Sequence, residues 1–159
     1  FVQPRYWGKR SLDYLWYGIG AYIKANPQIK YMFGPVTLSD SYPHEAKELI
    51  AAFYLQQFGQ QTKLAVGRRR FEIRDEVTSF IAEELAGDYK ESYKKLKLLL
   101  EEYGVKVPTL FKQYSELCEE DGCQFIDFSL DPDFNNCTDC LILVDVAKIK
   151  AKKYNRYIG

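Results

Sequence analysis

Hydrophobic residues recur every three or four positions in several parts of this chain, the pattern of helices with one buried face. The first such segment runs from Ser11 to Ala25 and ends before Asn26-Pro27, because a residue preceding proline avoids the helical region. A second begins near Pro43, after capping residues Ser39-Asp40-Ser41, and ends at Gly59. Its predicted buried positions are Ala46, Leu49, Ile50, Phe53 and Tyr54. Two more helices are predicted at about 75–86 and 88–103, each with an aspartate at its start.

Branched and aromatic residues dominate three other segments, which predicts strands at Tyr31–Ser39, Cys123–Leu130 and Cys140–Val146. The last two are expected to be neighbours, and the final one is apolar enough to lie inside a sheet. Gly34-Pro35 interrupts the first strand, since proline donates no hydrogen bond and glycine favours a bulge. Two interpretations stay open: a strand that splays away from its neighbour at this point, or an edge strand with a kink.

Helices and strands therefore share one predicted domain, residues 1–159, of the α/β class. We interpret the helical pair at about 75–104 as an insertion between the halves of the sheet. The 159 residues are enough for a hydrophobic core. Because the sequence begins with Phe rather than Met, we expect it to be part of a longer protein.

Charge and composition exclude several classes of protein. The 22 Lys and Arg are balanced by 22 Asp and Glu, which argues against a general nucleic-acid-binding protein. No apolar run reaches the roughly 18–20 residues of a membrane span, and no signal peptide is visible. These features favour a cytoplasmic protein.

Metal sites are also disfavoured. The four cysteines, Cys118, Cys123, Cys137 and Cys140, lack the turns of a zinc site, so reduced and buried thiols explain them better. The polar segment 131–136 begins like a calcium loop, but Ile142 stands where the twelfth position requires Glu. We expect a hairpin loop there and no bound metal.

The segment before the first helix combines chain geometry and positive charge. Arg5, Lys9 and Arg10 lie in a loop that leads from a short apolar start, expected to be a strand, into the helix beginning at Ser11. The first backbone N–H groups of a helix have no partner within the helix, and they attract anions together with the helix dipole. The loop is therefore either a phosphate-binding site or an ordinary surface turn.

Several motifs together resemble one family. The run from Val2 to Ser11 resembles the acyl-carrier loop of the GNAT acyltransferase superfamily, with Arg5 and Gly8 on the first two motif positions and Arg10 where Gly or Ala is usual. With the segments 12–22, 33–36 and 131–137, it resembles the GNAT branch labelled as hemolysins and related to ornithine-lipid N-acyltransferases. In that branch three or four further strands precede the region that corresponds to this chain.

The resemblance implies a GNAT-like mixed sheet flanked by helices, of which this chain is the C-terminal part. It also implies transfer of a fatty acyl group, in lipid metabolism, from acyl carrier protein or acyl-CoA to a small amine with ornithine-like character. The phosphopantetheine donor would contact the loop through its phosphates, and the thioester would lie where the fourth and fifth strands part. The donor-binding residues implied are Arg5, Gly8, Lys9, Arg10, Ser11, Phe33, Gly34, Val36 and Leu38.

Amide formation requires a base for the amine and an acid for the departing thiolate. His44 is the single histidine of the chain. Histidine side chains can exchange protons near neutral pH, although a surface histidine on a first helical turn is also ordinary. Asp40 could orient the amine or cap the helix. Tyr42 and Tyr114 are candidate proton donors.

Two basic segments support an alternative function. Arg68–Arg70 and the closing run 148–156, with five cations, would attract an acidic partner or an anionic lipid surface, although a charged tail is also common on soluble proteins. The alternative is therefore a catalytically silent module that docks an acidic carrier protein or contacts the inner membrane peripherally.

Overall fold

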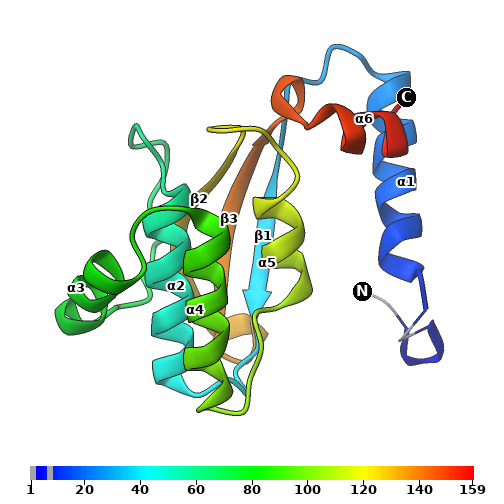
Figure 1. Cartoon of the computed structure of the whole chain (residues 1–159). Coiled ribbons are helices and arrows are strands. Elements are labelled where there is room, and N and C mark those ends of the chain that lie inside the picture. Colours follow the sequence, from blue (N-terminus) through cyan, green and yellow to red (C-terminus); the bar gives the residue numbers. More distant parts are fainter. Residues whose placement is uncertain (1–2, 7–8) are drawn as a thin grey trace.

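The protein is described by a computed structural model that covers residues 3–6 and 9–159 (Figure 1). Its elements are the 3-10 turn η1 (Pro4–Tyr6), α1 (Ser11–Ala25), β1 (Tyr31–Leu38), α2 (His44–Phe58), α3 (Asp75–Glu84), α4 (Tyr89–Glu101), α5 (Thr109–Ser115), β2 (Cys123–Asp131), η2 (Pro132–Phe134), β3 (Cys137–Asp145), η3 (Val146–Lys148) and α6 (Ala151–Tyr157).

The three strands form one antiparallel sheet in the order β1–β3–β2. β3 is the central strand, as its apolar sequence predicts, and Cys140 pairs with Val36 on one side and Phe128 on the other. The α/β class is confirmed: a small sheet flanked by helices, compatible with part of a GNAT-like fold. The polar hairpin at 131–136 is also confirmed, with Asn135 and Asn136 at positive φ.

β1 shows how Gly34-Pro35 is accommodated beside β3. Gly34 and Pro35 pair with Ile142 and Leu141 in an unbroken register from Tyr31 to Leu38, so the strand does not splay away from β3. Among residues 3–6 and 9–159, β1 pairs with β3 alone, and a proline is tolerated in such a strand because its missing N–H can face away from β3. The strand is therefore intact toward β3, and a splay from a strand on its other side stays a prediction.

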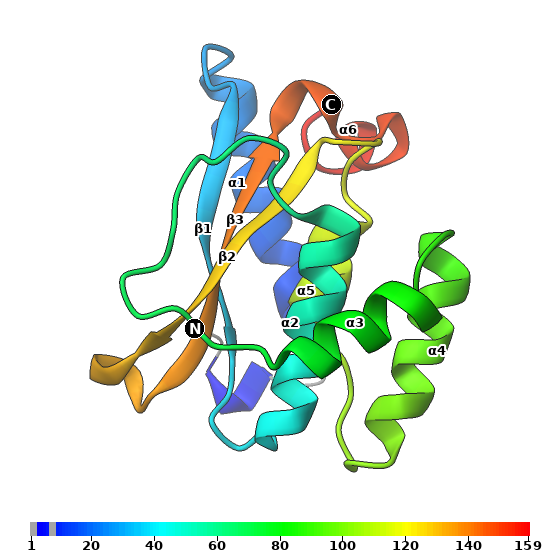
Figure 2. The same cartoon turned by 90° about the vertical axis from the view of Figure 1, so that its left-hand side faces the viewer.

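One face of the sheet is covered by α2 and α5, and α3 and α4 lie outside α2 (Figure 2). All residues of α2 from Ala46 to Tyr54 are buried, and they include the five predicted apolar positions. Tyr54 stacks on Phe125 of β2 at 4.6 Å between ring centroids and meets Phe111 of α5 edge-on at 5.2 Å. These rings tie the helical layer to the sheet.

The predicted helical pair is also present. Asp88 caps α4 as expected, because its carboxylate accepts hydrogen bonds from the backbone N–H groups of Lys90 and Glu91. Asp75 is not the N-cap residue of α3. Arg74 occupies the N-cap position, and its side chain makes no capping hydrogen bond.

The first and last helices pack together at one side of the sheet (Figure 1). A Cβ atom added to Gly20 of α1 would lie 1.8 Å from the carbonyl oxygen of Tyr157, so the two backbones touch at this point. α1 is also fixed to α5, where the Trp16 indole N–H donates to Gln113 at 3.0 Å and the ring meets Tyr114.

Within residues 3–6 and 9–159, no helix is both long enough and apolar enough to cross a bilayer. The same residues contain no cluster of three metal-ligating side chains. All four cysteines are buried and unpaired. Burial raises the pKa of Cys118 to about 11 and raises those of Cys123 and Cys140 further.

Candidate functional site

A cavity of about 610 Å³ lies at the start of α2, beside the hairpin that joins β2 and β3. It brings together two of the three predicted catalytic residues, Asp40 and His44. Its lining also includes Lys47, Glu48, Arg70, Arg74 and Asn136. A cavity of this volume is large enough for a small-molecule substrate.

His44 faces a buried carboxylate. Its Nε2 lies 4.0 Å from Oε2 of Glu48, which is one helical turn further on and fully buried. Arg74 holds that carboxylate with three side-chain hydrogen bonds of 2.7–3.1 Å and with its backbone N–H. Burial alone would raise the pKa of Glu48, but the bonds and charge of Arg74 outweigh it and lower the pKa. The Glu48 carboxylate near His44 is therefore already paired with a cation.

Asp40 and Tyr42 have different surroundings. Asp40 is half exposed and lies 3.6 Å from the buried ammonium group of Lys47, so it forms an ion pair instead of a helix cap. The Tyr42 hydroxyl donates to the carbonyl of Lys106 at 2.8 Å and does not line the cavity. Partial burial raises the pKa of this phenol.

The predicted phosphate-binding residues gather around Tyr6. The Arg5 guanidinium lies 4.8 Å and the Lys9 ammonium 6.0 Å from the centre of the Tyr6 ring, and the Ser11 hydroxyl donates to the Tyr6 carbonyl at 2.9 Å. Gly8 lies outside the described residues. The strand expected before this loop would include residues 1–2, which are also outside them, while Pro4–Tyr6 forms a 3-10 turn.

Arg10, the N-cap residue of α1, is bound to the first turn of that helix. Its guanidinium donates to Asp13 at 2.7 Å, and Asp13 also accepts hydrogen bonds from Arg156 and Tyr157 of α6. The bonds from Arg10 and Tyr157, with smaller contributions from Arg156, lower the pKa of Asp13 to about 2. A phosphate near this helix start would compete with Asp13 for Arg10.

The predicted positions on β1 do not share one surface. Val36 and Leu38 are buried against the helices, whereas Phe33 lies on the opposite face with 78 % of its surface exposed. Side chains alternate between the faces of a strand, so consecutive positions cannot line one channel with their side chains. Gly34 borders a small cavity of about 40 Å³ with Tyr114 and Met32.

The loop before α1 and the cavity at α2 are separate groups in the described part of the chain. Both the start of α1 and the end of β1 lie toward the lower end of the molecule in Figure 1. α1 is connected to β1 through its middle. Trp16 of α1 meets Tyr114, and Tyr114 lines the same small cavity as Gly34 of β1.

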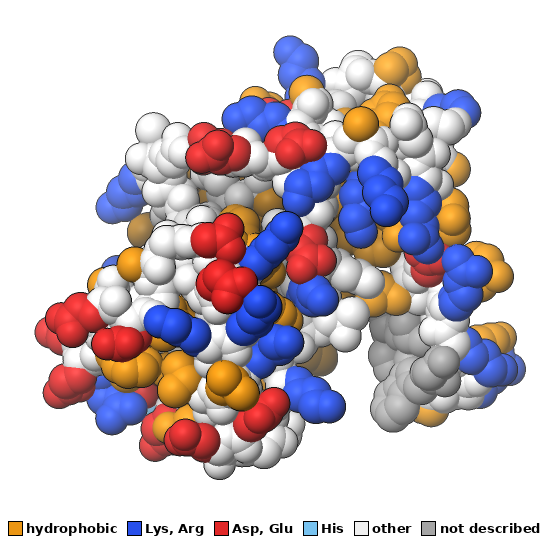
Figure 3. All heavy atoms as spheres, viewed as in Figure 1, with side chains coloured by type: hydrophobic (Ala, Val, Ile, Leu, Met, Phe, Trp, Pro, Cys, Tyr) orange, Lys and Arg blue, Asp and Glu red, His pale blue; other side chains and the backbone are white. Residues whose placement is uncertain are grey.

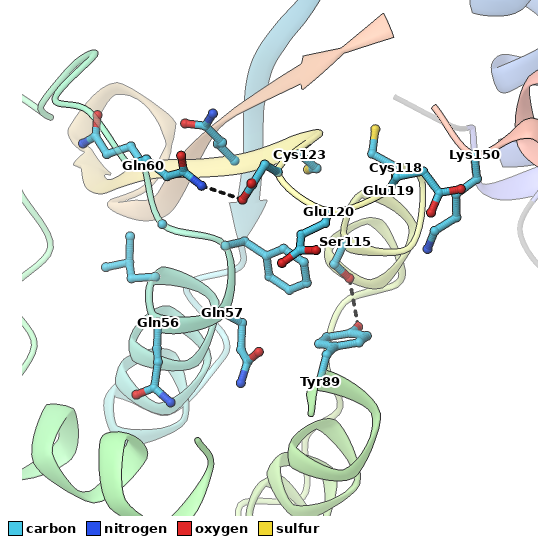
Figure 4. A pocket seen from close by; sticks show the side chains of 16 residues that line it. Gln56, Gln57, Gln60, Tyr89, Ser115, Cys118, Glu119, Glu120, Cys123 and Lys150 are labelled. Atoms are coloured by element: carbon cyan, nitrogen blue, oxygen red, sulfur yellow. Dashed lines mark hydrogen bonds between the residues drawn. The ribbon is translucent and has the colours of Figure 1, made fainter. Parts of the chain in front are cut away.

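A second cavity of about 590 Å³ lies at the opposite end of α2 (Figure 4). It is lined by polar groups that include Gln57, Glu119, Glu120 and Lys150, and the hydroxyls of Tyr89 and Ser115 are hydrogen-bonded at 2.9 Å. None of the residues predicted from the sequence as catalytic or donor-binding lines it.

Sequence reasoning missed Lys47, Glu48 and Arg74. A signal was present, because Lys47 and Glu48 are adjacent charges inside an apolar helix, and Glu48 follows His44 by four positions, which places both on one helix face. Arg74 could not be assigned, since its contact with Glu48 spans 26 positions.

Two curated relatives align with nearly all of this chain. A glycine N(alpha)-acyltransferase of Phocaeicola vulgatus is 28 % identical over 151 residues, which are 95 % of this chain and 46 % of the relative. A protein of the same name from Bacteroides thetaiotaomicron is 26 % identical over 154 residues, covering 95 % of this chain and 44 % of the relative. The chain therefore spans about half the length of each. No protein-family model and no solved structure matches the chain.

Proposed function

We propose that this chain is part of an N-acyltransferase that moves an acyl group from a thioester to the amine of a small amino acid. The observation that carries the proposal is the similarity to two glycine N(alpha)-acyltransferases across 95 % of the chain. The motifs that resemble GNAT acyltransferases support the same class of reaction independently.

The reaction needs few groups from the protein. The neutral amine nitrogen attacks the thioester carbonyl carbon, a C–N bond forms, and the C–S bond breaks to release a thiol. The proton lost by the amine passes to His44, whose Nε2 lies 4.0 Å from the buried carboxylate of Glu48. The thiolate takes up a proton, and no covalent enzyme intermediate is required.

The donor is a phosphopantetheine thioester, carried by coenzyme A or by acyl carrier protein. In this proposal its phosphates lie near Arg5, Gly8, Lys9, Arg10 and Ser11. The chain segment near Phe33, Gly34, Val36 and Leu38 contributes backbone groups, since the side chains of Val36 and Leu38 are buried. Tyr42 can protonate the thiolate only after it leaves the Lys106 carbonyl.

The acceptor is an α-amino acid. The names of the two relatives favour glycine, while the family resemblance favours an ornithine-like amine and a role in lipid metabolism. The cavity at α2 contains both acidic and basic side chains, which suits a zwitterion, and Asp40 is placed to attract its ammonium group.

The test is turnover by the full natural polypeptide. Two donors, long-chain acyl-CoA and acyl carrier protein loaded with the same acyl chain, are each combined with glycine and with ornithine. The N-acyl product is identified by mass spectrometry, and the released thiol is titrated. We expect an amide product with at least one pair. Absence of product with all four pairs would refute the proposal.

His44→Gln tests the base separately. We expect kcat to fall by about 10²–10⁴-fold with little change in KM. Glu45→Gln is the matched control, because Glu45 is exposed on the same helical turn and binds none of these groups. Undiminished kcat in His44→Gln would remove His44 from the mechanism.

A further inference from the structure

α1 exposes an uncharged face to solvent. Nine of its residues are exposed, and Lys24 is the single charged one among them; its ammonium group is turned to the carbonyl of Gly159. The side chains that point away from α6 include Tyr14 and Tyr22, which are 69 % and 64 % exposed. We define the α1 outer face as Tyr14, Leu15, Gly18, Ala21 and Tyr22, which share about one-third of the helix circumference.

Such a face is unusual for a helix in water. Exposed helix faces are normally charged, and a helix that is apolar around most of its surface is normally covered. Within the described residues, neither the Tyr14 nor the Tyr22 side chain makes a hydrogen bond or a ring contact; the Tyr22 backbone carbonyl accepts from the Asn26 side chain at 2.8 Å. Contact with another apolar phase would remove this surface from water.

The total charge of the chain is balanced, but its basic and acidic residues are unevenly distributed along the sequence. Residues 3–25 and 146–159, which contain α1 and α6, hold nine of the 22 Lys and Arg but one of the 22 Asp and Glu. The rest of the chain carries the opposite excess. Figure 3 shows basic side chains gathered over α6 and the start of α1, with hydrophobic side chains along the same edge of the molecule.

Arg68–Arg70 do not belong to this surface. Their loop lies on the other side of the sheet from α1 and α6 (Figures 1 and 2), and Arg70 is bound to Asp127 at 3.1 Å. The two basic segments that were grouped from the sequence therefore cannot contact one flat surface together.

We propose that the α1 outer face and the basic residues of η3 and α6 dock the protein on an anionic lipid surface. Tyrosine suits the boundary between headgroups and acyl chains, because its ring is apolar and its hydroxyl stays hydrated. Cations flanking an apolar helix face attract anionic headgroups and hold the helix in the interfacial plane. This inference rests on charge and exposure, not on the proposed reaction.

An acidic protein is the competing partner, and the apolar face favours lipid over it. Electrostatic docking of a carrier protein would use the cations alone and would leave Tyr14 and Tyr22 in water. A lipid surface uses both features, since headgroups pair with the cations while the aromatic rings enter the interface.

The first test measures sedimentation of the full natural polypeptide with vesicles of equal parts phosphatidylcholine and phosphatidylglycerol. We expect binding at low salt, weaker binding at high salt, and none to pure phosphatidylcholine. Lys148→Glu with Lys152→Glu should lower the partition coefficient about tenfold or more. Lys63→Glu with Lys90→Glu makes the same charge change at exposed positions elsewhere and should bind more tightly than the Lys148/Lys152 variant.

The second test separates lipid from protein partners. Tyr14→Gln with Tyr22→Gln keeps the charge and a helix-forming sequence, and we expect it to weaken vesicle binding severalfold; Leu98→Gln, at a 63 % exposed position of α4, is the control. The proposal is overturned if vesicles do not bind, if the tyrosine variant binds normally, or if an acidic carrier protein binds while vesicles do not. Protection of Tyr14 and Tyr22 from oxidative labelling without lipid would also overturn it, because another part of the protein would then cover the face. Thermal unfolding confirms that each variant is folded.

Discussion

Asp13 and Arg156 meet at 2.8 Å although 143 positions separate them in the sequence. Asp13 lies in the first turn of α1 and Arg156 in the last turn of α6, and Tyr157 donates a further hydrogen bond to the same carboxylate. This junction is the main polar contact between the first and last helices.

Asp13→Asn should loosen that junction. The amide keeps the shape but loses the charge that binds two arginines, so we expect Tm to fall by about 2–4 °C. Faster proteolysis within α6 should accompany the change. Asp133→Asn, in the exposed hairpin, is the control and should leave both measurements unchanged.

The stabilising effect of Asp13 should depend on acid pH. Its pKa is lowered from an ordinary 3.8 to about 2 in the folded protein, so the unfolded chain binds the proton more readily. Stability from this group is therefore complete above about pH 4 and is lost as the pH falls toward 2. Unfolding curves of wild type and Asp13→Asn should differ at pH 6 and converge near pH 2; a constant difference would contradict this.

Two glycines in α1 should respond oppositely to alanine. Gly20→Ala places a methyl group against the Tyr157 carbonyl and should cost about 1–3 kcal/mol, because α6 must move away. Gly18→Ala meets no atom within 4 Å and should stabilise the helix by about 0.5–1 kcal/mol. Urea unfolding measures both, and equal effects would show that the α1–α6 contact is wrong.

Glu48→Gln should destabilise the protein and reduce turnover. Glu48 is fully buried and accepts charged hydrogen bonds from Arg74, so we expect a loss of about 1.5–3 kcal/mol in the free energy of unfolding. Glu45→Gln, on the exposed side of the same turn, should change stability little. If His44 is the base, Glu48→Gln should also lower kcat in the fraction that remains folded.

The thiols of Cys118, Cys123 and Cys140 should be unreactive in the folded protein. Burial raises the pKa of Cys118 to about 11 and that of Cys123 further, which suppresses the thiolate. A thiol reagent at pH 8 should therefore modify these cysteines slowly until denaturant is added. Rapid native labelling of Cys118 would show that its surroundings open frequently.

Local pattern predicted most of the fold. The bounds of α1 and the buried positions of α2 follow from helical periodicity, and the central place of β3 follows from its continuous apolar run. Gly34-Pro35 left two interpretations open because the same pair suits a splayed strand and an intact edge strand, and the pairing with β3 shows the strand intact on that side.

The candidate site was less accessible to sequence reasoning. The roles of His44, Asp40, Tyr42 and the donor-binding residues stay predictions. The neighbours that give them physical meaning, such as Arg74 beside Glu48 and Lys106 beside Tyr42, come from distant segments. Position in the sequence also grouped Phe33 with Val36 and Leu38. In β1 the side chain of Phe33 lies on one face of the sheet, and those of Val36 and Leu38 lie on the other.

The pairing of α1 with α6 has a consequence for synthesis of the protein. A ribosome that adds about 5–20 residues per second needs roughly 7–30 s to travel from Asp13 to Arg156. During that interval Trp16 and Ile23, which are buried in the finished protein, have no α6 to cover them. The nascent chain therefore leaves these two apolar side chains of α1 without their α6 contacts until its last residues have been synthesised.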